Sequence, residues 1–283
     1  MLVAAGAVVA TVVPLAASTS TPAAAASSNT LTVTATEYTY KVSGSPKPGD
    51  IELAFDNVGV QYHMLGMVAL KNGVTAKQLE KALLSSDQNA GKKLVKGDGD
   101  VSPTPAFLAP NHKTTTIVNL PAGNYGIFCF FSAPDGSPHV AHGMVKTLQV
   151  SGSKSSYKPP TDGVVDVKLA DSGITLPSSG VPKSGWVKVT NTSSDKRDFV
   201  LAQYLTQDAT FDSANTYFND YFSSGKLPAG AAPASINGGV LSIPGGGTAY
   251  FQVDLKSGKY TVVSSLTNVN NDPNQTHADF TVS

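Results

Sequence analysis

The region that decides the fold and the chemistry spans residues 121–150 and reads PAGNYGIFCFFSAPDGSPHVAHGMVKTLQV. Within it, Cys129 is the only cysteine of the chain and ends a strand-like run. His139 and Met144 follow on the loop that leads into the next run, and His63 lies upstream after an Asn-Val-Gly turn. Two imidazoles, one thiolate and a thioether form a ligand set that suits copper in an electron-transfer site.

The composition describes a neutral chain with few charges. It has 283 residues, of which 20 are basic and 20 are acidic, and only 14% are charged. That length suits about two domains of ordinary size. A net charge of zero argues against a nucleic-acid-binding protein, because such a protein needs a basic face. We therefore expect no nucleic-acid partner.

Residues 1–26 have the character of a secretory signal. The apolar run from Leu2 to Ala17 is short for a membrane span, and a small-residue stretch follows it. This pattern predicts cleavage near Ala26 and a secreted or extracytoplasmic protein, at the cell surface or in a periplasm. No Lys or Arg precedes the apolar run. That departure counts against a signal, and the alternative is an uncleaved segment that gives N-terminal or peripheral membrane attachment.

An exported chain with one cysteine is informative in itself. Disulfides form in oxidising compartments, but a single cysteine cannot form one within its own chain. Cys129 must then be buried, paired with another molecule or bound to a metal.

Alternation of apolar and polar residues predicts an all-β protein. Four segments alternate clearly, namely 31–36, 51–55, 116–120 and 147–150. Alternation of this kind marks half-buried antiparallel strands, and Gly- and Pro-containing turns separate them. One segment alone is convincingly helical: Thr75 and Gln78 form a capping box, and Leu79 and Leu83 follow on one face.

An internal repeat divides the chain into two copies. Two motifs occur twice at similar spacing: 120–125 with 255–260, and 44–47 with 180–183. We therefore expect a first domain at residues 29–151, a linker at 152–162 and a second domain at 163–283. Each copy is large enough for a two-sheet sandwich with its own core.

The second copy lacks the ligand set. The repeat aligns Asp198 with His63 and Ser264 with Cys129, and no methionine follows Met144. We expect this copy to be a structural, docking or partner-binding domain without copper ligands. It contains the sequons that begin at Asn191 and Asn274, which matter if the host glycosylates exported proteins.

The segment around Cys129 resembles the cupredoxin family, which includes plastocyanin and azurin. Tyr125 lies four residues before the cysteine, as in plastocyanins. The tripeptides at 137–139 and 143–145 follow the plastocyanin ending, with four residues between the histidine and the methionine. The resemblance covers the first domain, and the repeat extends it to a tandem two-domain form. It implies Greek-key sandwiches and one type 1, or blue, copper at one pole. The ligands that it implies are His63, Cys129, His139 and Met144.

The chain departs from plastocyanins in one spacing. Nine residues, 130–138, separate the cysteine from the second histidine. Plastocyanin-like sites have a much shorter spacer, and the blue-copper domains of copper nitrite reductases have one of similar size. His142 is an alternative ligand, although its position suits a solvent-facing group better. Met64 and Met67 flank His63, and they form either a soft-metal patch or one face of a strand.

The first functional hypothesis is a secreted one-electron carrier with a single copper and an unidentified redox partner protein. In it His139, if exposed at the pole, would be the electron port, and Phe130, Phe131 and Val140 could form an apolar docking patch. The alternative is a copper-free, cupredoxin-like binding or structural module on the cell surface.

An enzyme is disfavoured by the histidine content. Multicopper oxidases and copper nitrite reductases need a second copper centre, and the resemblance implies a histidine directly before the cysteine. Phe128 occupies that position. The remaining histidines lie on unrelated segments, namely His112, His142 and His277.

Overall fold

A computed structural model describes residues 28–87, 89–267, 272 and 275–283. These residues form sixteen strands and two α-helices, which confirms the prediction of an all-β fold. Each of the four alternating segments lies within a strand. The expected signal segment, residues 1–26, lies outside the described residues. Among the described residues, no helix is both long enough and apolar enough to cross a membrane.

The first half of the chain, residues 29–151, supplies eight strands and one α-helix. In chain order its elements are β1 (Thr30–Thr36), β2 (Thr39–Ser43), β3 (Gly49–Asn57), β4 (Gly66–Leu70), α1 (Ala76–Leu83), η1 (Gly91–Lys93), β5 (Thr104–Pro105), β6 (His112–Leu120), β7 (Gly123–Phe128), η2 (His139–His142) and β8 (Val145–Val150). Strands β2-β1-β3-β6 and β4-β7-β8 form two sheets, and one buried apolar cluster takes side chains from both.

The second half, residues 163–283, repeats this arrangement. Its elements are β9 (Val164–Ala170), β10 (Gly173–Thr175), β11 (Ser184–Asn191), β12 (Arg197–Tyr204), α2 (Phe211–Ser224), β13 (Ala234–Ile243), β14 (Thr248–Asp254), β15 (Gly258–Leu266) and β16 (Thr276–Val282). Strands β10-β9-β11-β14 and β16-β15-β12-β13 enclose a second apolar cluster. Within each half one pair of strands is parallel, β1 with β3 and β9 with β11, so the sheets are mixed rather than purely antiparallel.

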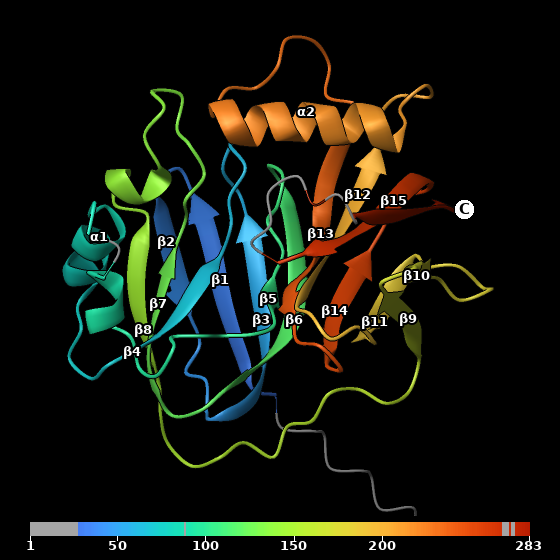
Figure 1. The fold of residues 1–283 in the computed structure, drawn as a ribbon. Helices are drawn as coiled ribbons and strands as arrows, with labels where there is room; N and C mark the ends of the chain where they lie inside the picture. Colours follow the sequence, from blue (N-terminus) through green and yellow to red (C-terminus); the bar gives the residue numbers. More distant parts are fainter. Residues whose placement is uncertain (1–27, 88, 268–271, 273–274) are drawn as a thin grey trace, which may run out of the picture.

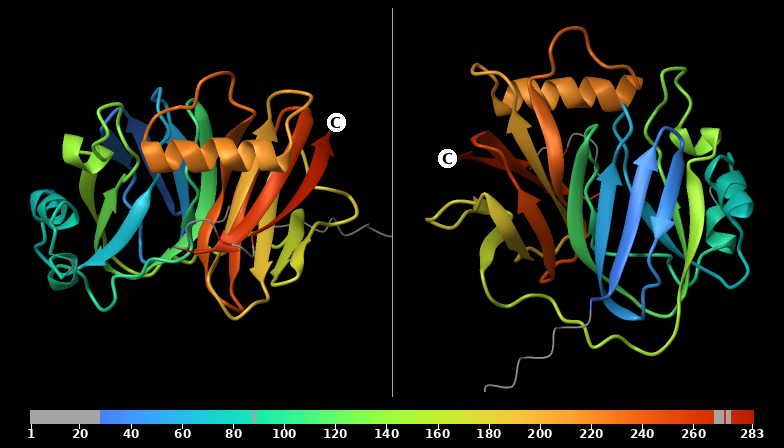
Figure 2. Two further views of the ribbon diagram at one scale, coloured as in Figure 1. Left: turned by 45° about the horizontal axis from the view of Figure 1, so that its top comes forward. Right: turned by 180° about the vertical axis from the view of Figure 1, so that it is seen from behind.

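The two halves share their sheets along a common seam. Strand β14 pairs with β6, which joins four strands of each half into one eight-stranded sheet. The short strand β5 of the first half extends the other sheet of the second half by pairing with β13 (Figures 1 and 2). The seam makes the two sandwiches neighbours that are linked by backbone hydrogen bonds.

The segment between the halves lies against the first sandwich. Ser155 N donates a hydrogen bond to Pro48 O at 2.8 Å. The buried Tyr157 donates its hydroxyl hydrogen to the carboxylate of Glu52 on β3. The segment contains no strand or helix. The domain boundaries at 151 and 163 remain a prediction.

Helix α2 was not expected from the sequence. Thr210 caps its first turn through Ser213 N, and Gly225 ends it with φ +69°. Its apolar positions recur at helical spacing, and Phe218 and Tyr221 are buried among them. Ser, Asn, Thr, Tyr and Phe have modest helix propensity, so only this spacing and the two caps indicated a helix. By contrast, α1 and its Thr75 capping box are confirmed.

An asparagine closes the corresponding strand end in each half. Asn57 ends β3, Asn191 ends β11, and both are fully buried. Each side-chain amide donates to the carbonyl four residues later and to two successive carbonyls of a distant segment. At 2.8 to 3.2 Å, these acceptors are Gln61, Leu108 and Ala109 for Asn57, and Asp195, Ile243 and Pro244 for Asn191. This burial excludes a glycan on Asn191 in the folded chain, and Asn274 lies outside the described residues.

Candidate metal centre

Backbone pairing brings three distant segments to one end of the first sandwich. His63 exchanges two backbone hydrogen bonds with Leu108, at 3.1 and 2.9 Å. Cys129 directly follows β7, and its N–H donates to Met144 O at 3.2 Å. Met144 N in turn donates to His139 O at 3.1 Å. The ligand-bearing loops are therefore held by main-chain bonds that do not depend on a metal.

The side chains of His63, Cys129 and His139 converge on one point. The two Nδ1 atoms are 3.2 Å apart, and Cys129 Sγ lies 3.4 Å from His139 Nδ1 and 4.0 Å from His63 Nδ1. A point equidistant from the three atoms lies about 2.1 Å from each, within the range of metal–nitrogen and metal–sulfur bonds. All three residues are fully buried. The geometry fits a metal ion bound by two nitrogens and one sulfur.

Burial sets the charge of the three groups. It lowers the pKa of His63 to about 4, with His139 as the next cause, and it lowers the pKa of His139 to about 4 as well. Both imidazoles are therefore neutral at pH 7 and have lone pairs to offer. Burial raises the pKa of the Cys129 thiol to about 11. Binding of a metal to the sulfur would then release its proton.

A hydrogen bond fixes the tautomer of His139. Its Nε2 lies 3.2 Å from Gln61 Oε1, which can only accept, so Nε2 carries the proton and Nδ1 faces the cluster. The amide nitrogen of Gln61 donates to the hydroxyl of Tyr38 at 3.1 Å. Such supporting contacts orient metal-binding histidines.

The other imidazole faces a glycine and an acid. His63 Nε2 is buried and makes no hydrogen bond within the described residues. A Cβ placed on Gly59 would lie 3.0 Å from this nitrogen and closer still to the carboxylate of Glu37. Glu37 is held by the backbone N–H of Val60 and raises the pKa of His63 against the larger effect of burial. Gly59 thus leaves the space in which the ring and the carboxylate approach each other.

The sulfur of Cys129 receives backbone donors. Met64 N–H points at Sγ at 3.5 Å, and the backbone of Phe131 lowers the pKa of the thiol. Donors of this kind stabilise a thiolate. The Tyr40 hydroxyl itself donates to Met64 O, and the ring is buried.

The remaining residues singled out from the sequence lie in different places. Met144 is fully buried in the same apolar cluster as Cys129, and its role as a metal ligand remains a prediction. His142 lies outside the group: its Nε2 contacts Ser137 Oγ at 2.7 Å, and its ring stacks on Tyr38. Met64 and Met67 pack against the apolar core.

The two histidines farther from the site have local contacts. His112 begins β6, and its Nδ1 lies 2.8 Å from Pro110 O. His277 stacks on Phe211 of α2 with ring centroids 4.0 Å apart. Neither belongs to the His63–Cys129–His139 group.

His139 is fully buried, so the condition under which it would be the electron port is not met. Gln61 contacts its outer nitrogen, and the Tyr38 ring packs edge-on against it at 5.1 Å. The expected docking patch is also incorrect in part: Phe130 is 42% exposed, but Val140 is fully buried and Phe131 packs into an aromatic cluster. The sequence did not indicate this cover, because Gln61 and Tyr38 belong to no local motif.

The long spacer forms a tight hairpin-like loop. Ser132 and Pro138 form a bridge, and Ala133 N donates to Ser137 O at 2.7 Å. His139 N then donates to Phe131 O at 2.8 Å. Nine residues therefore separate the two ligands in sequence without separating their side chains in space.

In the second half, Arg197 occupies the place of His63. His63 pairs with Leu108, whose carbonyl accepts from the asparagine at the end of β3. Arg197 pairs with Ile243, whose carbonyl accepts from the corresponding asparagine of β11. The expectation that Asp198 stands here is therefore wrong by one residue.

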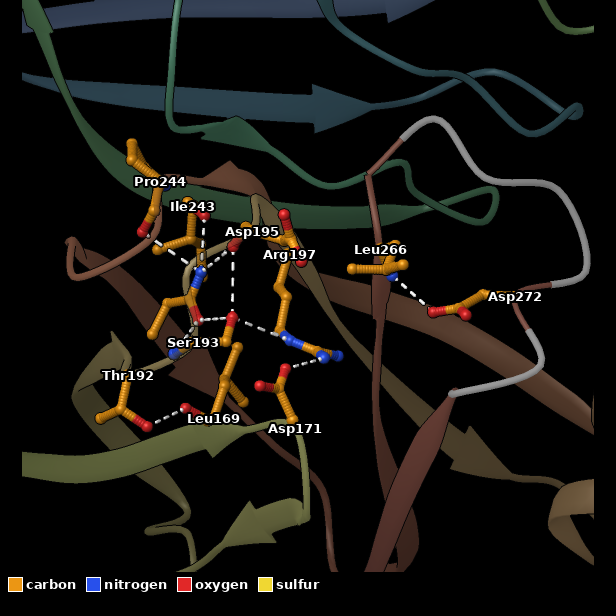
Figure 3. A network of polar contacts seen from close by, with 11 residues as sticks. Leu169, Asp171, Thr192, Ser193, Asp195, Arg197, Ile243, Pro244, Leu266 and Asp272 are labelled. Atoms are coloured by element: carbon orange, nitrogen blue, oxygen red, sulfur yellow. Dashed lines mark hydrogen bonds and ion pairs between the residues drawn. The ribbon is translucent and has the colours of Figure 1, made fainter.

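The guanidinium of Arg197 is buried, with 2% of the residue exposed. Its Nη2 donates to Asp171 Oδ1 at 2.6 Å, and its Nε donates to Ser193 Oγ at 3.1 Å (Figure 3). Ser264 is fully buried near the position that Cys129 has in the first half. A guanidinium offers no lone pair, so the second half has a cationic side chain at the position where the first half has a candidate metal ligand.

No protein-family model matches the chain, and no curated protein matches it in sequence. Among solved structures, reduced auracyanin from the photosynthetic bacterium Roseiflexus castenholzii is 24% identical over 45% of this chain and 100% of that chain, with a TM-score of 0.30. Lac15 from a marine microbial metagenome is 12% identical over 90% of this chain and 67% of that chain, with a TM-score of 0.28. A copper-containing nitrite reductase from Thermus scotoductus is 10% identical over 90% of this chain and 61% of that chain, with a TM-score of 0.22. The chain is similar to these proteins in fold alone, so the chemistry of the site rests on its own geometry.

Proposed function

We propose that the protein binds one copper ion in its first half and carries single electrons outside the cytoplasm. The observation that carries this proposal is the convergence of two imidazole nitrogens and one sulfur in a fully buried site. Imidazole and thiolate together suit copper, and this His₂Cys set is that of blue-copper electron-transfer sites. Met144 would complete the set as a weak axial ligand. The partner is a redox protein, and the N-terminal sequence supports export.

The chain's own groups fit this task. Copper, when bound, would supply a one-electron couple. Gln61 holds His139 in the tautomer that presents Nδ1 to the site, and Met64 N–H supports the sulfur of Cys129. The main-chain bonds between Cys129, His139 and Met144 hold the loops in place before any ion arrives. A fixed site is favourable for electron transfer, because the ligands need to move little when the charge changes.

Addition of Cu(II) to the full chain tests the proposal. We expect a strong visible absorption from charge transfer between thiolate and copper, at one copper per chain. Cys129→Ser should abolish the colour, and His142→Ala is the matched control that should keep it. A colourless protein without stoichiometric copper would show that the proposal is wrong and would favour a copper-free module.

The carrier role needs a separate measurement. The loaded protein should be reduced and reoxidised by one electron per copper, without turnover of nitrite or phenols. Turnover of either substrate would favour an enzyme instead. Within the described residues, the His63–Cys129–His139 group is the one cluster of its kind.

A further inference from the structure

Helix α2 of the second half contacts the segment that carries His63. The ring of Tyr62, the preceding residue, is buried against Phe218 and Tyr221 of the helix, with ring centroids 5.8 and 5.4 Å apart. Because Tyr62 and His63 are adjacent, a shift of this ring would move the backbone from which the imidazole projects.

The same helix contacts the spacer between Cys129 and His139. Phe222 stacks on Phe131, with centroids 4.9 Å apart and an interplanar angle of 19°, and Phe107 packs edge-on against both rings. Gly225, which ends the helix, lies directly against Ser132: a Cβ on the glycine would be 2.3 Å from Ser132 Cβ. The end of α2 therefore packs so closely on the spacer that no side chain fits at position 225 beside Ser132.

The two spacer residues that touch α2 are also tied by backbone contacts to the segment that carries the ligands. Phe131 O accepts the backbone hydrogen bond of His139, and the Phe131 backbone is among the donors that lower the pKa of Cys129. Ser132 forms a β-bridge with Pro138, which directly precedes His139 in the chain. A continuous set of contacts thus runs from the helix through two residues to two of the candidate ligands.

We propose that α2 is a positioning element of the copper site, and that holding the ligand loops of the first half is a function of the second half. This inference rests on the proposed function. The inference also gives the long spacer a role, because residues 130–138 form the surface against which the helix packs. In Figures 1 and 2 the helix lies across one end of both halves, as this role requires.

The test introduces one methyl group at the end of the helix. Gly225→Ala places a Cβ against Ser132, and Gly246→Ala is its matched control. Both glycines have nearly the same φ, +69° and +70°, but a Cβ on Gly246 would meet nothing within 4 Å. Both substitutions therefore strain the backbone equally, and only the first displaces the spacer. Ser132→Gly in the Gly225→Ala background removes the obstructing Cβ and should restore the site.

The first measurement uses the metal-free full chain. Hydrogen exchange of the amides of residues 130–139 should be about tenfold faster in Gly225→Ala than in the original protein or in Gly246→Ala. Because no copper is present, this result is independent of the proposed function. Unchanged exchange in Gly225→Ala, and also in Phe222→Ala as a second variant, would overturn the inference.

The second measurement uses the copper-loaded protein. Gly225→Ala should shift the energies and relative intensities of its visible bands and its Cu(II) electron paramagnetic resonance signal, and Ser132→Gly should reverse the shift. Spectra identical to those of Gly246→Ala would contradict a positioning role. A protein that shows the exchange effect but never turns blue would retain the contact between helix and spacer and contradict the copper proposal alone.

Discussion

At the scale of single residues, Gln61 decides which nitrogen of His139 faces the site. Its carbonyl oxygen holds the proton on Nε2. In Gln61→Leu the ring loses this partner and can adopt either tautomer, so we expect the affinity for copper to fall about 10- to 100-fold. Competition with a chelator at fixed pH measures the change. Gln149→Leu, on the exposed face of β8, should bind copper like the original protein. Equal affinities for both variants would rule out this role.

A second residue, Asp198, links stability to pH. Burial raises the pKa of this carboxyl above its ordinary value near 3.8, although Thr267 and the Ser242 N–H donate to it. A raised pKa means that the folded state binds the proton more tightly than the unfolded state. The stabilising contribution is therefore complete below pH 3.8 and is lost as the pH rises through the folded pKa.

Asp198→Asn should remove that dependence, because the amide oxygen can still accept both hydrogen bonds. Urea unfolding between pH 4 and pH 7 measures it: relative to the original protein, the variant should gain free energy of unfolding as the pH rises. A difference that stays constant over this range would show that Asp198 titrates normally.

The sequence predicted three of the site residues but not their surroundings. The residue types and the spacing around Cys129 indicated His63 and His139, and the structure brings these three together. Gln61 could not be predicted, because a hydrogen bond to a ring 78 residues away has no local pattern. Arg197 was missed because the repeat aligned His63 with Asp198, one residue too far along the chain. A shift of one residue in a strand exchanges its two faces.

At the scale of elements, α1 packs on the strand that leads to Cys129. Leu79 is 1% exposed, and its Cδ2 would be 2.2 Å from a Cβ on Gly126 of β7. Leu79→Ala should lower the free energy of unfolding by about 2–5 kcal/mol, through lost burial and a cavity. Urea unfolding measures this loss. Leu84→Ala, at a position that is 44% exposed, should change it by less than about 0.5 kcal/mol. Equal effects would show that α1 is not packed as described.

The two helices differ in how well their sequences predict them. Thr75 caps helix α1 and forms a capping box with Gln78, and a leucine-containing face follows, so the sequence pattern clearly predicts a helix. Helix α2 consists mostly of residues with weak helical preference, and its packing against both halves stabilises it. Tertiary contacts commonly decide such cases. The helix that we propose to position the site was therefore the element hardest to predict.

At the scale of the whole molecule, the seam predicts that the halves stay together when the chain is cut. Pairing of β6 with β14 and of β5 with β13 holds them by main-chain hydrogen bonds. Lys196 and Asp100 add an ion pair at 2.7 Å across the same seam. A protease site inserted between Gly152 and Ser153, both exposed, allows one cut in the connecting segment.

After this cut we expect the two pieces to co-elute in size-exclusion chromatography under native conditions and to separate in urea. The uncut protein is the control for elution volume. Separation without denaturant would show that the seam is weaker than the structure indicates. The seam itself could not be predicted, because alternation in a strand identifies its buried face but not the neighbour along its edge.

Because Arg197 is buried in the second half, the two halves differ in whether their cation can be removed. The second half carries its cation on the chain, tied to Asp171, and no chelator removes it. The first half would gain its cation only from solution. Withdrawing copper should therefore increase deuterium uptake in β4, β7 and β8, and leave β12 and β15 unchanged. With copper bound as proposed, one half of the protein would gain stability from the metal supply, and the other half would carry its buried cation in its sequence.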